Sequence, residues 1–224
     1  PKQESSQTVV QIKSVNYKNI LSEVSLIIQK DQRLALIGDN GSGKTTLVKL
    51  ILSQLVPDSG EINIGNGVQI GYLSQEHQEL DSDKTVLDEL ANGNIDKTES
   101  YKLLRRFLLS PEKINQPVKL LSSGEKAKLL LAKIMTSGAN FIILDEPTNH
   151  LDIQSREAIE EALANYSGTL LVISHDRYFL DKIGITGSVK NLGEKGENGC
   201  GLFQKLAQKG SPREWPARQS PFCI

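Results

Sequence analysis

The feature that most constrains the fold is a glycine-rich loop at residues 38–45, which reads GDNGSGKT. An apolar run at 33–37 precedes this loop, and a helical pattern begins at about Lys44 and ends before Pro57. A strand, a glycine-rich loop and a helix in this order form the context of a phosphate-binding loop. Glycines let successive backbone N–H groups turn toward phosphate oxygens, and the helix N-terminus adds its positive dipole end. The loop therefore predicts a nucleotide-binding α/β fold.

Side chains in and just after this loop are suited to hold a nucleotide and its metal ion. We expect Lys44 to reach the β- and γ-phosphates, Thr45 to offer its hydroxyl to Mg²⁺, and Thr46 to add a donor near the α-phosphate. The other positions expected to surround the phosphates are Gly38, Asn40, Gly41, Ser42 and Gly43. An ordinary glycine-rich turn is the alternative interpretation, and the flanking strand and helix argue against it.

A pair of carboxylates ends a second apolar run, at 141–144. The run is short and bounded by turn residues, which favours a buried parallel strand, and Pro147 ends it because proline lacks a backbone donor. Because successive strand side chains point to opposite sides, we expect Asp145 to bind Mg²⁺ with Thr45, and Glu146 to orient or deprotonate a water. A solvated turn is the alternative interpretation. The choice between a base and a water-orienting group for Glu146 stays open at this point.

Predicted strands and helices alternate along the chain. Apolar or alternating patterns predict strands at about 24–28, 33–37, 61–64, 68–73, 141–144 and 169–173, with helical periodicity between 85 and 109. The last strand is followed by Ser174, His175 and Asp176, so polar residues gather at strand exits. This order describes an α/β fold with a parallel sheet and a site at its carboxyl edge.

The segment LSSGE at 121–125 has two compatible interpretations. Ser122, followed three residues later by Glu125, makes a helix capping box. A capped helix start in which Gly124 permits close approach also forms an anion site. We therefore include Ser122 and Gly124 among the candidates to bind phosphate.

Three single residues are candidates with equally plain structural alternatives. Gln75 and His175 each follow a strand, where an amide and an imidazole could hold a γ-phosphate and its water. Both are therefore catalytic candidates, and Gln75 is also a candidate metal ligand. Tyr17 could stack on a base, although a partly buried aromatic is an equal alternative.

Composition narrows the class of protein. The chain has 224 residues, of which 38% are hydrophobic, and no stretch approaches the roughly 20 apolar residues of a membrane span. The net charge of −1 gives no general reason to expect nucleic acid, and the two cysteines lie near the C-terminus. The polar start, without Met or an apolar centre, is not typical of a signal peptide. We expect a soluble, cytoplasmic protein without membrane insertion, which can be a fragment.

The character of the sequence changes after about residue 183. Residues 184–224 are rich in glycine, contain both cysteines and the only Trp, and show no sustained helical or strand period. We therefore predict one domain at 1–183, with helical character at about 76–130, and a poorly ordered tail at 184–224.

The order of these motifs resembles that of the ATP-binding cassette (ABC) ATPases over about residues 9–183. The resemblance rests on the phosphate loop at 38–46, Gln75 as the Q-loop glutamine, the signature at 121–125, Asp145-Glu146, the D-loop at Leu151-Asp152, and His175 as the switch histidine. It implies a P-loop cassette with a RecA-like parallel-sheet core, a small antiparallel β subdomain and a short helical subdomain. It also implies that ATP and Mg²⁺ lie between the phosphate loop of one cassette and the signature of a second, in the same full-length chain or in a homodimer.

Within this family the chain is most similar to the ABC-F subfamily, soluble twin-cassette proteins that act on ribosomes. The similarity rests on EPTNHLD at 146–152, SHDRYFLD at 174–181 and the short passage from Gln75 to Thr85-Val86-Leu87. The signature has Ser123 where the family usually has Gly, and one cassette is present where ABC-F chains carry two. The resemblance implies an ATPase whose parent protein binds the ribosome and acts in translation or antibiotic resistance. An ATP-binding subunit of a membrane transporter and an inactive truncated cassette are the alternatives.

Overall fold

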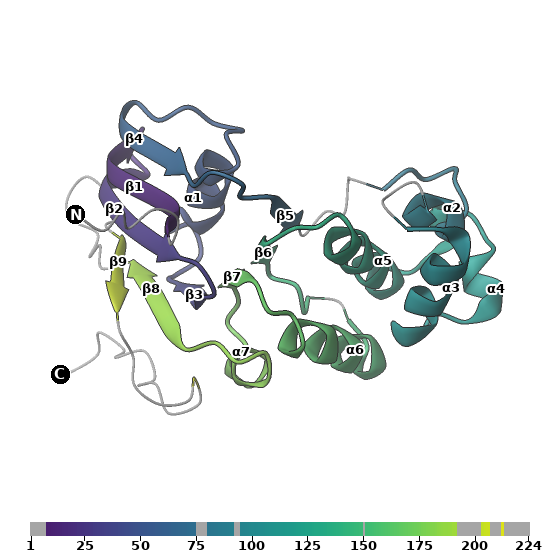
Figure 1. The fold of residues 1–224 in the computed structure, drawn as a ribbon. Coiled ribbons are helices and arrows are strands. Elements are labelled where there is room, and N and C mark those ends of the chain that lie inside the picture. The colour runs from purple at the N-terminus through teal and green to yellow at the C-terminus, as the bar shows by residue number, and fades with distance from the viewer. Residues whose placement is uncertain are drawn as a thin grey trace, which may run out of the picture.

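The computed structural model describes residues 8–74, 80–91, 95–149, 151–191, 203–206 and 212. A six-stranded sheet forms the centre of the fold, with strand order β5-β6-β7-β3-β8-β9 (Figure 1). Its strands are β3 (Arg33–Ile37), β5 (Ile70–Leu73), β6 (Phe141–Asp145), β7 (Thr169–Ile173), β8 (Gly187–Asn191) and β9 (Phe203–Leu206). The first five strands pair in parallel, and β9 pairs antiparallel to β8.

The central strand β6 shows why its sequence is apolar throughout. Phe141 and Ile143 belong to the core on one face of the sheet, whereas Ile142 and Leu144 belong to the core on the other. Both faces are covered, so a buried parallel strand needs no polar side. This confirms the interpretation of the run at 141–144.

A second, antiparallel sheet has the order β2-β1-β4. It consists of β1 (Thr8–Tyr17), β2 (Leu21–Gln29) and β4 (Ser59–Ile64), and with α1 (Lys44–Ile51) it surrounds the core on one face of the parallel sheet (Figure 1). No strand was expected at 8–17. The alternation in β1 is irregular because its pairing with β2 shifts between Thr8 and Val10, between Ile12 and Val15, and between Val15 and Tyr17.

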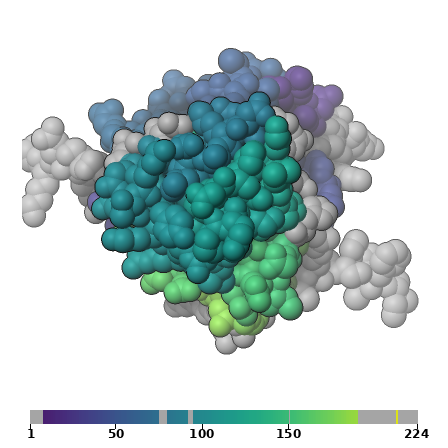
Figure 2. All heavy atoms as spheres, turned by 90° about the vertical axis from the view of Figure 1, so that its right-hand side faces the viewer, coloured from purple at the N-terminus to yellow at the C-terminus, as the bar shows by residue number. Residues whose placement is uncertain are grey.

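The helices of the middle of the chain form a separate layer (Figure 1). They are α2 (Val86–Ala91), α3 (Lys97–Arg106), α4 (Pro111–Ile114) and a short 3₁₀ turn at Val118–Leu120. Helix α5 (Ser123–Thr136) follows and packs against both this layer and the parallel sheet. Seen from their own side, these helices occupy the centre of the molecular face (Figure 2). The helical periodicity between 85 and 109 therefore corresponds to two helices, α2 and α3.

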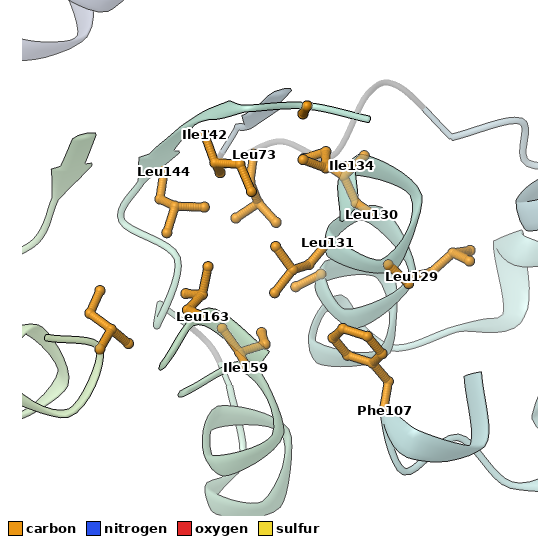
Figure 3. Close-up of a cluster of buried hydrophobic side chains, with 14 of the residues drawn as sticks. Leu73, Phe107, Leu129, Leu130, Leu131, Ile134, Ile142, Leu144, Ile159 and Leu163 are labelled. Carbon is orange, nitrogen blue, oxygen red and sulfur yellow. The ribbon is translucent and has the colours of Figure 1, made fainter. Parts of the chain in front are cut away.

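Helices α5, α6 (Ile153–Ala164) and α7 (Arg177–Lys182) help to cover the other face of the parallel sheet. Figure 3 shows how α5 and α6 meet the sheet: Leu131 and Leu163 lie between the helices and the strand residues Ile142 and Leu144. All four side chains are fully buried. This packing fixes the two helices against the strand that carries the acidic pair.

The region after residue 183 differs from its prediction. We expected no strand there, but β8 pairs in parallel with β3 through Leu34–Gly187 to Ile37–Lys190, and β9 extends the sheet. The strand was missed because Val189 is the only large apolar residue of β8, although Val189 and Ser188 are fully buried. Within the described part of the chain, no helix has the length and apolar character needed to cross a membrane.

Candidate functional site

The glycine-rich loop joins β3 to α1 as the sequence predicts. Gly43 is the N-cap of α1 and has φ of 86°, a left-handed conformation that favours glycine. Gly41 has φ of 79°, and the Ser42 N–H donates to the Asp39 carbonyl at 3.2 Å. The loop therefore curls back over the N-terminus of α1, where backbone N–H groups and the helix dipole favour a phosphate.

Lys44 lies inside this loop. Its ammonium donates to the carbonyl oxygens of Gly38, at 2.9 Å, and Asp39, at 2.8 Å, and only 8% of the residue is exposed. Two backbone carbonyls therefore hold the Lys44 side chain at the mouth of the loop. Asn40 and Thr45 are exposed in the same region, and Thr46 is half-buried in the first turn of α1.

The Thr45 hydroxyl and the Asp145 carboxylate meet. Thr45 Oγ1 donates to Asp145 Oδ2 at 3.0 Å, although the two residues are 100 positions apart in the chain. Burial raises the pKa of Asp145, and the hydrogen bond from Thr45 opposes that rise. A hydroxyl and a carboxylate are hard oxygen donors, which suit Mg²⁺.

The prediction of a Mg²⁺ site fits this donor set. Among the described residues, no group of three or more His, Cys, Asp or Glu side chains is arranged to hold a metal ion. A site with few protein ligands is typical of Mg²⁺ that also binds substrate phosphates, and less typical of a closed structural site. Thr45 and Asp145 are the described side chains that would hold the ion.

Glu146 leaves the strand through a turn. Its φ is 48°, its N–H donates to the Ile173 carbonyl at 2.9 Å, and its Oε1 lies 3.6 Å from His175 Nε2. Strand β6 ends at Asp145, so the different directions of the two acids arise from this left-handed turn as well as from strand alternation. Glu146 and His175, from adjacent strand exits, therefore face each other at the carboxyl edge.

Burial and the neighbouring Asp145 raise the pKa of Glu146, while the charge of Lys44 opposes the rise. A carboxylate with a raised pKa is a better proton acceptor than an ordinary one. The electrostatic setting therefore suits a group that takes a proton from water.

The start of α5 has the capping box that the sequence predicts. Ser122 Oγ accepts from the Glu125 N–H at 3.3 Å, and the Glu125 carboxylate accepts from the Ser122 N–H at 2.8 Å. Gly124 is buried, and a Cβ there would lie 3.2 Å from Ser155 Oγ and 3.4 Å from Asp152 Oδ2. Gly124 thus permits close approach of α5 to the start of α6, and no described hydrogen bond joins Ser122 to the phosphate loop.

Two other predicted residues have different outcomes. Tyr17 is only 8% exposed and belongs to the core under the antiparallel sheet, which favours its structural alternative; base stacking stays a prediction. Gln75 lies outside the described residues, so its catalytic and metal-binding roles stay predictions.

The sequence interpretation missed Tyr72. Its hydroxyl lies 3.5 Å from Asp145 Oδ2, and its strand β5 runs beside β6. The sequence did contain a signal for this residue: a tyrosine, whose hydroxyl is polar, stands in the apolar strand that precedes Gln75.

The sequence is similar to proteins of known family. Residues 21–149 match the family described as ABC transporter. The chain is 48% identical over 179 residues to the putative ATP-binding protein YdiF of Bacillus subtilis, covering 78% of this chain and 28% of that protein. It is 44% identical to the ATP-binding protein Uup of Escherichia coli (75% of this chain, 27% of that protein) and 40% identical to ABC transporter F family member 5 of Arabidopsis thaliana (80% and 27%).

The fold is similar to solved structures. The post-hydrolysis dimer of the ATP-binding cassette MJ0796, bound to ADP and Pi, matches with a TM-score of 0.73 at 20% identity, over 90% of this chain and 99% of that chain. A second dimeric structure of MJ0796, named as a bacterial ABC transporter cassette, matches with a TM-score of 0.72 at 21% identity. At this level of identity the likeness establishes the fold alone.

Proposed function

Because this chain belongs to the ABC transporter family and has the fold of its ATP-binding cassettes, we propose that it hydrolyses ATP to ADP and phosphate as one member of a cassette pair of ABC-F type. This proposal rests on two contacts at the carboxyl edge of the sheet. Thr45 contacts Asp145, and Glu146 lies beside His175.

Different residues of this chain bind the phosphates, hold the metal ion and act on the water. The loop N–H groups and Lys44 bind the phosphates, and Thr45 and Asp145 would hold Mg²⁺, which supplies positive charge that neutralises the β- and γ-phosphate oxygens. Glu146 orients the attacking water and accepts its proton as the water oxygen bonds to the γ-phosphorus and the bond to ADP breaks. His175, beside Glu146, is placed to hold the γ-phosphate or the water.

A second cassette is the proposed partner. The similar MJ0796 structures are described as dimeric, and the signature start at Ser122 shares no described hydrogen bond with this chain's phosphate loop. We further propose that the ribosome is a partner of the whole protein, in translation or ribosome-protecting antibiotic resistance. The support is the similarity to an ABC transporter F family member and the ABC-F motifs, of which His150 lies outside the described residues.

The test is ATP turnover by purified chain and by two glutamate variants. Glu146→Gln should slow phosphate release at least about 10-fold while nucleotide binding is kept, because an amide cannot accept the proton. Glu157→Gln, which neutralises an exposed glutamate on α6, is the matched control and should hydrolyse ATP like the unchanged chain. Equal turnover by Glu146→Gln and the control would refute the assigned role. Co-sedimentation with ribosomes, with and without ATP, tests the proposed partner.

A further inference from the structure

Arg156 connects helix α6 to the turn that carries His175. Its Nε donates to Glu160 Oε1 at 2.8 Å, one turn along the same helix, and its Nη1 donates to Asp176 Oδ2 at 2.8 Å. The guanidinium also lies over the Tyr178 ring, 5.4 Å from the centroid. The planar guanidinium therefore makes three contacts, which define the position of the Arg156 side chain. Of this side chain, 29% is exposed.

Three interactions hold Asp176, the residue that follows His175. Its Oδ1 accepts from the Phe179 N–H at 2.9 Å and thereby caps α7, and its own N–H donates to Ser174 Oγ at 3.1 Å. Arg156 binds the remaining carboxylate oxygen. The backbone on the C-terminal side of His175 is therefore fixed by one helix cap, one turn and one ion pair.

The ion pair between Arg156 and Asp176 is partly buried. Burial lowers the pKa of Arg156, but the carboxylates of Glu160 and Asp176 outweigh that effect, so the pKa rises overall. Only 29% of each of the Arg156 and Asp176 side chains is exposed, which limits screening by water.

We propose that Arg156 is a positioning residue that holds Asp176, and through it the backbone of His175, so that the imidazole stays beside Glu146. This inference rests on the proposed function, because it assigns Arg156 to the water-binding side of the same site. The contact at stake is the 3.6 Å approach of His175 Nε2 to Glu146 Oε1. Arg156 contacts neither ATP nor water in this scheme.

The first measurement does not depend on hydrolysis. The chain has only three histidines, so the His175 imidazole can be followed by NMR of labelled protein. Glu146→Gln should change the His175 chemical shifts, because it alters the group that faces the ring. In the Arg156→Ala background, the same Glu146→Gln change should move the His175 shifts by less than about half as much, because the two side chains are no longer held together.

The second measurement is turnover. Arg156→Ala should lower kcat about 10-fold with KM within about 2-fold, because a displaced positioning group affects the reacting geometry and leaves the phosphate loop unchanged. Arg156→Lys should recover part of the loss. Arg106→Ala, which removes an exposed arginine from α3, is the control and should keep wild-type kcat.

Asp176→Asn provides a second route to the same contact. The amide oxygen can still cap α7, whereas the charge that attracts Arg156 is lost, so this variant should reproduce the effect of Arg156→Ala even if the latter does not fold. Full Glu146–His175 coupling in a folded Arg156→Ala or Asp176→Asn variant would overturn the proposal. If the unchanged chain does not hydrolyse ATP, the proposed function fails, while the NMR result still decides the positioning role.

Discussion

Gly43→Ala is the substitution for which the structure predicts the largest effect in the phosphate loop. Gly43 has φ of 86°, and a Cβ at this position would lie 2.8 Å from Leu21 Cδ2 and 3.0 Å from Ile20 Cγ2. The left-handed conformation costs an L-residue about 1–2 kcal/mol. The overpacked contact adds about 1–3 kcal/mol, since Leu21 is fully buried and has little room to move.

The sum predicts a loss of about 2–5 kcal/mol in the free energy of unfolding. For a chain of this size, each 1 kcal/mol lowers Tm by about 2–4 °C, so Gly43→Ala should lower Tm by about 4–20 °C. The variant should also bind ATP more weakly, because Gly43 is the N-cap at which the loop enters α1. Thermal unfolding followed by circular dichroism and titration with a fluorescent ATP analogue measure the two effects.

Gly41→Ala is the matched control in the same loop. Gly41 has φ of 79°, but among the described residues other than its two chain neighbours no atom lies within 4 Å of the position that its Cβ would take. Only the conformational cost of about 1–2 kcal/mol applies, so Tm should fall by about 2–8 °C. Equal loss of stability in the two variants would refute the reasoning, because it would show that contact with Leu21 and Ile20 contributes nothing.

Two further predictions concern the charged groups of the site. Burial and Asp145 raise the pKa of Glu146, so its favourable contribution to stability is present below the ordinary value of 4.5 and is lost as the pH rises through the raised pKa. Glu146→Gln should therefore raise Tm by a few degrees at pH 7 and give no gain below about pH 4.5, which thermal scans across this range would check; a gain that is independent of pH would contradict it. Lys44→Ala should weaken ATP binding about 10-fold or more, measured by nucleotide titration, whereas Lys49→Ala on the exposed side of α1 should have a much smaller effect.

Local patterns predicted the elements whose residues determine their own structure. The glycine-rich loop, β6 and the capped start of α5 are each specified by a few adjacent residues, and the structure confirms all three. Strand β8 could not be predicted in this way. It contains one large apolar residue, Val189, and forms because β3 offers an unpaired edge for parallel pairing, which is a tertiary cause.

The sequence predicts which residues form the candidate site but does not predict their geometry. The sequence indicates that Asp145 and Glu146 act differently, and it attributes the difference to strand alternation. In the structure, the left-handed backbone of Glu146 turns the second acid toward His175. A positive φ in a non-glycine residue has no sequence signal here, because it is imposed by the Glu146 N–H bond to Ile173 and by the chain that follows.

The two predicted phosphate-binding elements of this chain lie in different places in the fold. The loop at α1 contacts Asp145 through Thr45, whereas the start of α5 packs through Gly124 onto Asp152 and Ser155. Strands β5 and β6 lie between α1 and α5 in Figure 1, and the fully buried Leu131 of α5 belongs to the core on the opposite face of the sheet from α1. Because α1 and α5 pack on opposite faces of the parallel sheet, we expect the two elements to contact different ATP molecules. In the proposed pairing with a second cassette, this chain would supply one half of each of two sites.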